Sequence, residues 1–228
     1  MRTVIITGSE GLIGSVVSKH LEESGYDVIR VDLSLGVDLT DEDQVKDFFS
    51  KNNADSLVNL FGMNHHMDKN VKCVNDFLEI DKNDLNAYHE CNVAALFSVC
   101  REFIKNNHSD LEIVNFSSLY GITSPKKSIY PTSVKHVGYV TSKHAVTGLT
   151  KYIATHFAPR VTANTICPGG VDNEYMDPVF RERYCNHTPM GRMASAKDVC
   201  GLVALLCSDG GRYINGTVIP VDGGWTAW

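Results

Sequence analysis

The chain has 228 residues, of which 43% are hydrophobic, so it is long and apolar enough for one large domain with a substantial core. Its formal net charge of −6 excludes the basic surface typical of nucleic-acid-binding proteins, and no apolar run approaches the ~20 residues that cross a membrane. The seven scattered cysteines and the absence of a signal-peptide pattern before the first strand lead us to expect free thiols and a cytoplasmic location.

Strand-like and helix-like segments alternate along the chain, which predicts a parallel sheet with helices on both faces. Residues 62–82 and 121–137 lack a clear periodicity, and residues 170–193 mix charged and aromatic side chains. Long loops in a compact α/β domain usually carry function. In chain order, the expected strands are residues 3–6, 28–31, 56–60, 112–116, 161–167 and 217–221, and the expected helices are residues 12–24, 38–50, 83–106, 138–157 and 197–208.

A glycine-bearing turn joins the first expected strand to the first expected helix. Its glycines are Gly8, Gly11 and Gly14. Glycines let the backbone turn sharply and approach a pyrophosphate closely, while the N-terminus of the following helix offers free N–H groups to the anion. The position of the turn, after a strand and before a helix, indicates a dinucleotide site, with an ordinary strand-to-helix turn as the alternative.

Asp32 ends the second expected strand, 18 residues after Gly14. A carboxylate at this place accepts hydrogen bonds from the adenosine ribose hydroxyls and repels a 2′-phosphate. Glu10 adds a second negative charge in the turn, whereas Arg30, expected on the same face as Asp32, has the opposite sign. We expect NAD rather than NADP as the cofactor. The alternative is that Asp32 is a solvated residue at a strand end.

Tyr139 and Lys143 are four residues apart on an expected helix, so their side chains share a face. An ammonium group near a phenol favours the phenolate, and it lowers the tyrosine pKa from about 10 towards the neutral range that a general acid/base needs. The spacing also occurs by chance. It gains weight from Ser117 and Ser118, which end an apolar strand where a parallel sheet opens its ligand crevice.

These residues together resemble the short-chain dehydrogenase/reductase family, in its compact single-domain branch, from Thr3 to Trp225. The resemblance implies an α/β fold: a doubly wound, Rossmann-like parallel sheet of about seven strands, in a single domain over residues 1–228. It also implies homodimers or homotetramers formed through the helices at 83–106 and 138–157. The motifs that carry it are the glycine turn, Asn92, Asn115-Phe116-Ser117-Ser118, Tyr139-Val140-Thr141-Ser142-Lys143, Pro168-Gly169 and Val221-Asp222-Gly223-Gly224.

The resemblance implies a role for each member of a catalytic set. Tyr139 is the acid/base, and Ser118 orients the substrate oxygen. Lys143 binds the nicotinamide ribose and lowers the tyrosine pKa, and Asn92 holds a water molecule of a proton relay. Val171 meets the nicotinamide carboxamide through its backbone. The implied cofactor-binding residues are Gly8, Gly11, Ile13, Gly14, Asp32, Asp38 and Leu39 (the last two at the adenine), Asn59, Gly62, Tyr139, Lys143, Pro168, Gly169 and Val171.

Three departures from the family pattern concern the cofactor side. The middle glycine of the turn is Gly11, a spacing that resembles the family's larger sugar-nucleotide branch. Phe61 stands where the family keeps an alanine. Between Asp32 and Asp38 a helix and most of a strand are missing, so we expect a more open adenine pocket.

A fourth departure lies beside the catalytic tyrosine. Ser118 and Tyr139 are 21 residues apart, which is longer than the resemblance implies, so we expect an inserted active-site loop near residues 123–137. Ser128 and Ser133 in this loop are rival candidates for the serine role. We favour Ser118 because a strand end fixes geometry better than a loop does.

Two other groups of residues have more than one interpretation. His65, His66 and Asp68 fit a metal site, a substrate contact or a solvated loop, and no third ligand has a helical or hairpin spacing to the histidines. We expect no metal. The second group fits either a substrate phosphate or carboxylate, or an exposed helix face; it comprises Arg181, Arg183 and His187.

The expected function is that of an NAD-dependent oxidoreductase acting on a small molecule. It passes a hydride between the nicotinamide and a hydroxyl or carbonyl carbon of a polar, sugar-like substrate. One alternative is a sugar-nucleotide epimerase or dehydratase, which uses the same tyrosine and lysine. Another is a non-catalytic, NAD-responsive regulator, against which the presence of the whole catalytic set argues. That set is Asn92, Ser118, Tyr139 and Lys143.

Overall fold

The computed structural model describes residues 1–64, 77–130 and 135–228, and the sheet at its centre is parallel throughout. The strands lie in the order β2-β1-β3-β4-β5-β6, so the chain runs outward from β1 to β2 and then resumes on the other side of β1. This order confirms the doubly wound, Rossmann-like sheet and places a switch point at the carboxyl ends of β1 and β3. The strands are β1 (Thr3–Thr7), β2 (Asp27–Val31), β3 (Ser56–Asn59), β4 (Leu111–Phe116), β5 (Val161–Pro168) and β6 (Val218–Val221).

Within the described ranges the sheet has six strands, where the family resemblance implies about seven. After β2 the chain makes a 3-10 turn at Leu33–Leu35 and soon begins α2 (Glu42–Lys51). A further parallel strand with its helix requires a crossover of a dozen or more residues, for which this connection has no room. The six strands expected from the hydrophobic runs are all present.

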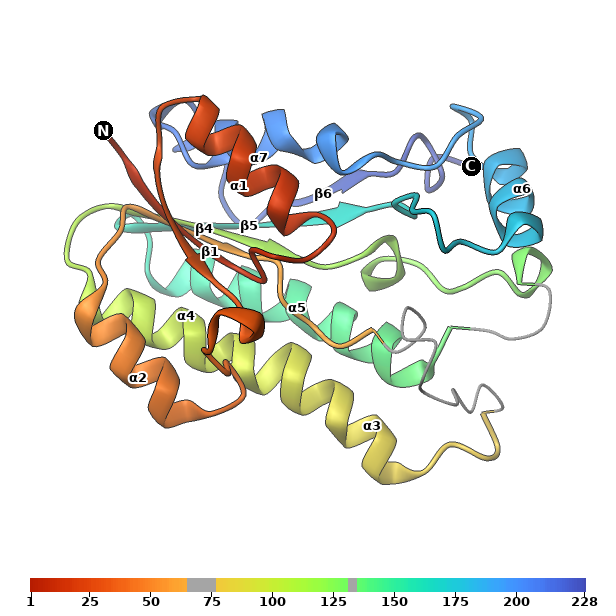
Figure 1. Cartoon of the computed structure of the whole chain (residues 1–228), viewed down its shortest axis with the longest axis horizontal. Helices are drawn as coiled ribbons and strands as arrows, with labels where there is room; N and C mark the ends of the chain where they lie inside the picture. The colour runs from red at the N-terminus through yellow and green to blue at the C-terminus, as the bar shows by residue number, and fades with distance from the viewer. Residues whose placement is uncertain (65–76, 131–134) are drawn as a thin grey trace.

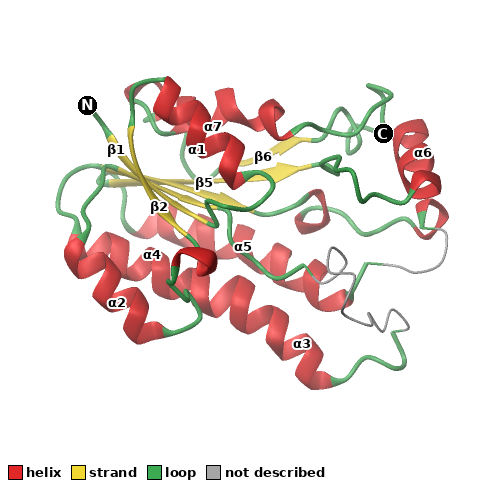
Figure 2. Ribbon diagram, viewed as in Figure 1, coloured by secondary structure: helices red, strands yellow, loops and turns green. Residues whose placement is uncertain are grey.

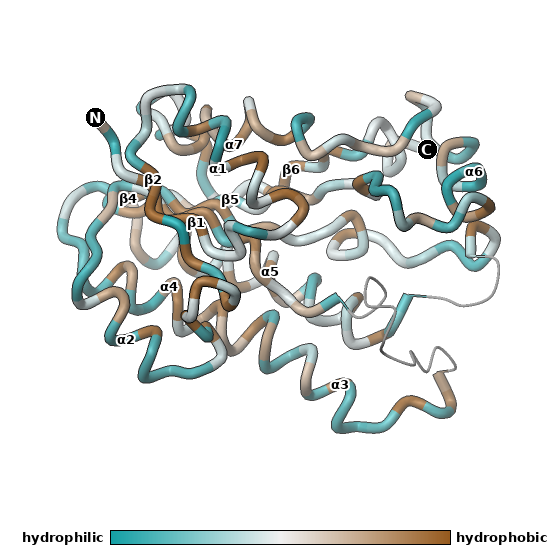
Figure 3. Tube along the Cα trace, viewed as in Figure 1, coloured by the Kyte–Doolittle hydropathy of each residue, from teal (hydrophilic) through white to brown (hydrophobic). Residues whose placement is uncertain are grey.

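Helices cover both faces of the sheet (Figure 1). α1 and α7 lie on one face, and α2, α4 and α5 lie on the other, as the same view coloured by secondary structure also shows (Figure 2). Separate apolar cores fill the two interfaces, with Val17 and Val203 in one and Phe49 and Phe103 in the other. Hydrophobic residues gather along the sheet, whereas much of α2 is hydrophilic (Figure 3). The remaining helices are α1 (Gly14–Glu23), α3 (Lys82–His89), α4 (Ala95–Asn106), α5 (Val137–His156), α6 (Pro178–His187) and α7 (Cys200–Leu206).

The long helix expected at residues 83–106 is interrupted. A π-helical turn at Glu90–Ala94 separates α3 from α4. Asn92 lies in this turn and is only 3% exposed. Single π-helical turns inside helices often occur at functional sites, because the extra residue re-aims the side chains around it. The sequence pattern shows the apolar face of the helix but not this interruption.

A third apolar cluster lies beyond the sheet and joins three segments that are far apart in the chain. The segment after β4, helix α6 and the C-terminal residues contribute to it. Tyr184 of α6 stacks on Trp225 with 4.3 Å between the ring centroids, and Trp225 is 1% exposed. The cluster is made of Leu119, Tyr120, Ile129, Tyr130, Tyr184, Met193 and Trp225.

Helix α6 was not expected from the sequence, because residues 170–193 show no regular apolar stripe. Local signals nevertheless mark its start. The Asp177 side chain accepts a hydrogen bond from the Phe180 backbone N–H at 2.8 Å, and Pro178 occupies the first turn. An N-cap aspartate followed by a proline is a typical way to begin a helix.

The described ranges contain no helix that is long and apolar enough to cross a membrane. Six cysteines in these ranges are free thiols, which confirms that expectation for them. Cys73 lies outside the described residues, as do His65, His66, Asp68 and Ser133.

Candidate active site

The carboxyl ends of four neighbouring strands bring the expected site residues to one edge of the sheet. The glycine turn follows β1, and Gly62 comes shortly after β3. Ser117 and Ser118 follow β4, and Gly169 follows β5. A doubly wound sheet binds its ligands at this edge, beside the switch point.

The glycine turn approaches neighbouring backbone so closely that side chains are excluded. Gly8 has a φ of +69°, and a Cβ there would lie 2.5 Å from the backbone nitrogen of Phe61. A Cβ on Gly14 would lie 2.0 Å from the Gly8 carbonyl oxygen, whereas one on Gly11 would lie 3.3 Å from it. Ile13 is the N-cap of α1, and its side chain makes no capping hydrogen bond. The first N–H groups of α1 therefore fit a pyrophosphate.

Asp32 is fixed beside the glycine turn by hydrogen bonds to its carboxylate. It accepts from the Ser34 backbone N–H at 2.9 Å, from the Ser34 hydroxyl at 2.8 Å and from the Glu10 N–H at 3.2 Å. Partial burial acts to raise the pKa of Asp32, but these hydrogen bonds outweigh it and the pKa is lowered. Asp32 is therefore an ionised acceptor at the position where an adenosine ribose is expected.

Arg30 carries the opposite charge to Asp32, and its side chain binds acidic side chains of the protein itself. Its guanidinium donates to Glu22 at 3.0 and 3.2 Å and to Glu10 at 3.3 Å. Two carboxylates therefore offset its charge, and Arg30 does not present an isolated cation to a 2′-phosphate.

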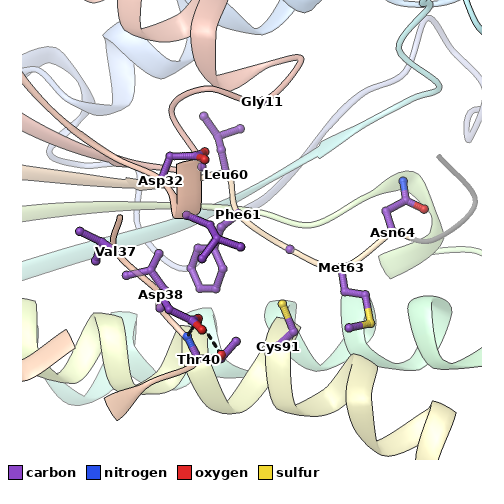
Figure 4. Close-up of a pocket in the computed structure, with 14 residues that line it drawn as sticks. Gly11, Asp32, Val37, Asp38, Thr40, Leu60, Phe61, Met63, Asn64 and Cys91 are labelled. Carbon is purple, nitrogen blue, oxygen red and sulfur yellow. Dashed lines mark hydrogen bonds between the residues drawn. The ribbon is translucent and has the colours of Figure 1, made fainter. Parts of the chain in front are cut away.

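A pocket of ≈ 640 Å³ lies between the glycine turn and the loop after β3 (Figure 4). Asp38 and Leu39 line it, as expected for the adenine side, and the Asp38 carboxylate accepts two hydrogen bonds from Thr40. Phe61 forms part of the wall and also packs against the core beneath α2 and α4. The bulky Phe61 side chain therefore does not fill the pocket. Its lining residues are Gly8, Gly11, Asp32, Leu33, Val37, Asp38, Leu39, Thr40, Leu60, Phe61, Gly62, Met63, Asn64 and Cys91.

Asn59 was expected to bind the cofactor, but its side chain makes hydrogen bonds inside the protein. It is 2% exposed, donates to Asn115 Oδ1 at 2.8 Å and accepts from the Thr7 hydroxyl at 2.9 Å. Asn115 in turn donates to the Thr150 hydroxyl at 3.0 Å. This buried network ties β1, β3, β4 and α5 together, and the Asn59 side chain does not line the pocket.

Tyr139 and Ser118 meet at the start of α5, where a side-chain hydrogen bond from Ser118 acts on the phenol. The Ser118 oxygen also accepts from the Tyr120 backbone N–H at 3.1 Å. Ser117 is used differently, since its hydroxyl donates to the Lys143 carbonyl at 2.7 Å. Ser128 is exposed in the 3-10 turn Lys127–Ile129. The geometry therefore favours Ser118 for the serine role.

Asn92, Gly62 and Lys143 lie together behind the tyrosine. The Asn92 side chain accepts from the Met63 N–H at 2.6 Å and donates to the Ser142 hydroxyl at 2.9 Å. A Cβ on Gly62 would lie 3.0 Å from Asn92 Oδ1 and 3.3 Å from Lys143 Nζ. The π-helical turn therefore brings Asn92 towards Lys143, an arrangement that the expected proton relay requires.

The segment after β5 closes the other side of the edge. The Gly169 N–H donates to the Val221 carbonyl at 2.9 Å, and Val171 forms an isolated parallel bridge with Ala194. The Gly170 N–H donates to the Tyr184 hydroxyl at 2.5 Å, which links this segment to α6. Pro168, Gly169 and Val171 are thus held at the edge of the sheet that carries Ser118 and Tyr139.

Comparison with known proteins now identifies the family. The family described as enoyl-(acyl carrier protein) reductase matches residues 15–226. A 3-oxoacyl-(acyl-carrier-protein) reductase from Aquifex aeolicus is 31% identical over 235 residues, which cover 97% of this chain and 86% of that protein. The chain is a short-chain dehydrogenase/reductase.

Further relatives agree with this assignment. A 2-dehydro-3-deoxy-D-gluconate 5-dehydrogenase from Bacillus subtilis is 28% identical over 258 residues, covering 98% of this chain and 94% of that protein. A short-chain dehydrogenase from Leptospira borgpetersenii, solved with bound NAD+, has the same fold, with a TM-score of 0.86 at 24% identity over 99% of this chain and 92% of that one. These relatives are dehydrogenases and reductases, so this short-chain dehydrogenase/reductase is a hydride-transfer oxidoreductase.

One expectation about this short-chain dehydrogenase/reductase, the lowered pKa of Tyr139, is wrong. Burial raises the pKa of Tyr139, against the hydrogen bond with Ser118 that lowers it. Burial also lowers the pKa of Lys143 to about 8. Lys143 Nζ donates to the Phe116 carbonyl at 3.1 Å and lies 5.9 Å from the centre of the Tyr139 ring. Burial is therefore the largest influence on the pKa of Tyr139, and the lowering expected from the Lys143 ammonium group is not found.

The charged residues of α6 make contacts within the protein. Arg181 pairs with Asp172 at 2.9 Å, and the Arg183 guanidinium donates to the Ser128 carbonyl at 3.3 Å. His187 contacts Lys126 of the segment after β4. No group of three metal-ligating side chains converges in residues 1–64, 77–130 and 135–228.

The residue that the sequence interpretation missed is Lys135. Its Nζ lies 4.3 Å from the centre of the Tyr139 ring and donates to Asn64 Oδ1. Lys135 lies four residues before Tyr139 in the sequence, and this spacing could have drawn attention to it. Because Lys135 precedes α5, the spacing alone does not predict that its side chain lies over the Tyr139 ring.

Proposed function

We propose that this short-chain dehydrogenase/reductase uses NAD to interconvert a hydroxyl and a carbonyl group on a small, polar, sugar-like substrate. The observation that carries the cofactor choice is the fixed Asp32 carboxylate beside the glycine turn, together with the pairing of Arg30 to Glu22 and Glu10. This carboxylate would repel a 2′-phosphate, whereas it would accept hydrogen bonds from two ribose hydroxyls. Bound NAD supplies the site that accepts or donates the hydride.

The catalytic residues supply the proton chemistry. In the oxidation direction, the ionised Tyr139 oxygen takes the proton of the substrate hydroxyl and becomes the hydroxyl; in the reduction direction, the Tyr139 hydroxyl returns that proton to the substrate oxygen. Ser118, next to Tyr139, donates a hydrogen bond to the same substrate oxygen and holds it in place. Lys143, with a pKa of about 8, gains and loses protons near neutral pH, and Asn92 positions the path to solvent.

The substrate class is supported by a relative of the chain. The Bacillus subtilis relative is named as a dehydrogenase of a sugar acid. Gly11 has the spacing of the sugar-nucleotide branch, which favours a sugar-nucleotide epimerase or dehydratase as the second candidate function. That second candidate predicts tightly held NAD that is not consumed in net turnover.

A fluorescence titration with NADH and NADPH tests the cofactor choice. We expect wild type to bind NADH more tightly, and Asp32→Ala to reduce this preference by about tenfold, the loss of a hydrogen bond to a charged group. Asp43→Ala, an exposed acid on α2 with a side chain 92% exposed, is the matched control and should leave the preference unchanged. Tighter binding of NADPH to wild type would contradict the proposal.

Turnover is then followed at the nicotinamide absorbance with sugars, polyols and their acids. A change in absorbance supports the oxidoreductase. Product without a net change in absorbance favours the epimerase or dehydratase, and NADH binding without any product favours the regulator.

We also propose that the protein forms a homodimer or homotetramer through α4 and α5. The support is an apolar surface on these helices, where Phe97 is 49% exposed and Tyr152 is 60% exposed. A hollow beside it is lined by Val93, Phe97 and Leu149 among others. Analytical ultracentrifugation of Phe97→Asp against wild type tests this, with a shift to monomer as the expected result.

A further inference from the structure

Arg30 lies on the strand that leads to the expected adenosine ribose. It belongs to β2, and Asp32 directly follows that strand with an extended backbone. Side chains two residues apart on an extended chain point to the same face. A guanidinium group therefore lies near the position where NAD carries a hydroxyl and NADP a phosphate, and this group is well suited to bind phosphate.

The guanidinium of Arg30 forms a two-point contact with Glu22. Arg30 Nε donates to Glu22 Oε1 at 3.0 Å, and Nη2 donates to Glu22 Oε2 at 3.2 Å. This parallel pair of hydrogen bonds fixes the plane of the guanidinium as well as its charge. Glu22 lies in the last turn of α1, whereas a pyrophosphate is expected at the first turn. Glu22 therefore holds two of the guanidinium nitrogens at a place that the phosphates do not reach.

Glu10 contributes to the same arrangement from the glycine turn, and its main chain and side chain have separate contacts. The Glu10 N–H donates to Asp32 at 3.2 Å, whereas its carboxylate accepts from Arg30 Nη1 at 3.3 Å and from the Ser9 hydroxyl at 3.1 Å. The backbone of Glu10 thus helps to fix Asp32. Its carboxylate is the acceptor for Arg30 that a phosphate would otherwise supply.

These ion pairs are exchangeable, because none of their members is deeply buried. The exposed fraction of the side chain is 31% for Arg30, 37% for Glu10 and 43% for Glu22. Ion pairs that are this accessible to solvent contribute little to the stability of a fold. The glutamates can therefore be changed one at a time without unfolding the chain, and Arg30 can move once they are changed.

We propose that Glu10 and Glu22 help to determine the cofactor specificity by holding Arg30 in ion pairs, and that release of Arg30 would create a site for a 2′-phosphate. This inference rests on the proposed NAD-dependent function and adds two residues to the choice of cofactor. The Asp32 carboxylate would still repel a 2′-phosphate in the released state. The Arg30 charge would offset that repulsion, because the two side chains share a face.

The test measures the ratio of the Kd values for NADPH and NADH by fluorescence titration of Glu10→Gln, Glu22→Gln and the double variant. Glutamine keeps the length of the side chain, and Glu10→Gln keeps the backbone N–H that donates to Asp32. We expect the ratio to fall by about tenfold in the double variant and by less in each single one. This is the lower end for a hydrogen bond between charged groups, since the side chains are partly exposed.

Two controls separate release of Arg30 from a general change of charge. Glu23→Gln alters the next acid on α1, which pairs with Lys19 at 3.8 Å, and should leave the ratio as in wild type. Addition of Arg30→Gln to the double variant should abolish the gain in NADPH affinity.

A calorimetric titration with adenosine 2′,5′-bisphosphate and 5′-AMP gives a readout without the nicotinamide and without turnover. These two fragments differ only in the 2′-phosphate, so the ratio of their Kd values should fall in the double variant as it does for the cofactors. The gain should shrink at high ionic strength, because salt screens charges that are exposed to solvent.

A gain in NADPH affinity that persists after Arg30→Gln would show that the glutamates act only by general repulsion, and would overturn the inference. An unchanged ratio in the double variant would also overturn it. Both results leave the NAD-dependent function intact, provided that wild type binds NADH more tightly than NADPH. Wild type that prefers NADPH, or binds neither cofactor, would instead refute the proposed cofactor choice and this inference with it.

Discussion

The expected cofactor side, around the glycine turn, and the expected substrate side, around Tyr139, lie on one sheet edge but are built differently. The cofactor side rests on the backbone: Gly8 and Gly14 come so close to neighbouring main-chain atoms that no side chain fits. On the substrate side, Tyr139 packs against an aromatic cluster from distant segments. In this cluster the Tyr130 hydroxyl donates to that of Tyr120 at 2.9 Å, and Tyr184 stacks on Trp225. Backbone constraints can be read in a sequence, whereas aromatic packing between distant segments cannot.

We expect the largest effect from a substitution that removes proton transfer and leaves cofactor binding unchanged. Tyr139→Phe removes the hydroxyl that exchanges the proton, so turnover should fall by about a thousandfold, within the range for loss of a general acid/base. The ring remains, so NADH affinity measured by fluorescence should stay as in wild type. Tyr213→Phe, which alters a fully exposed tyrosine, is the control. Undiminished turnover in Tyr139→Phe would refute the mechanism.

The next prediction concerns a substitution that disrupts only the cofactor side. In Gly14→Ala the new Cβ would lie 2.0 Å from the Gly8 carbonyl oxygen, so the turn must deform. We expect loss of measurable NADH binding, and a free energy of unfolding lower by about 1–3 kcal/mol, the usual range for overpacking. Gly201→Ala in α7 is the control, because nothing lies within 4 Å of its Cβ. There the substitution should preserve binding and stabilise the helix by about 0.5–1 kcal/mol.

A third prediction concerns Lys143, which lies between the two sides. Its pKa is lowered from 10.5 to about 8 by burial, so between these values the unfolded chain binds more protons than the folded one. The unfolding free energy of wild type, relative to Lys143→Met, should therefore rise with pH from about 8 to 10.5, by at most about 1.4 kcal/mol per pH unit. Chemical denaturation across this window measures it.

The comparison with Lys143→Met cancels shifted groups on which Lys143 does not act, such as Cys100 and Cys207, whereas Cys91 and Cys167, whose pKa values the Lys143 charge lowers, contribute to the difference. Lys151→Met, at an exposed position of α5, should show no such dependence on pH. A difference between wild type and Lys143→Met that stays constant with pH would show that Lys143 keeps its ordinary pKa.

The smallest expected effect tests the substrate side. Tyr130→Phe removes a buried hydroxyl and leaves the Tyr120 oxygen without its donor, which should lower the free energy of unfolding by about 1 kcal/mol. NADH affinity should not change, because neither tyrosine lines the cofactor pocket. Tyr213→Phe, at a fully exposed tyrosine, is the control. A weaker NADH affinity in Tyr130→Phe would show that the two sides are coupled.

The sequence predicted the sheet, and the places of the glycine turn and Asp32 beside it, for physical reasons. Parallel strands buried on both faces appear as apolar runs, and the glycine turn and Asp32 occupy fixed places relative to them. The interpretation of Arg30 was incomplete, because its partner Glu22 comes from α1 and only the folded chain brings them together.

The substrate side was predicted less well. Helix α6 has no regular apolar stripe because it packs on a local aromatic cluster and not on the sheet. The pKa of Tyr139 was expected to fall, but burial, which no spacing reveals, raises it. Lys135 was overlooked because its direction depends on how the preceding segment returns to α5.

The π-helical turn at Glu90–Ala94 holds one residue more than an α-helical turn would. Deleting one residue here would therefore restore a continuous α-helix and leave α3 and α4 in phase. Tyr88 would keep its stacking on His136 and Val99 its place in the core, but Asn92 would no longer be directed towards Met63 and Ser142. The turn thus works as a local insertion, which sets the direction of one side chain without changing the path of the helices on either side.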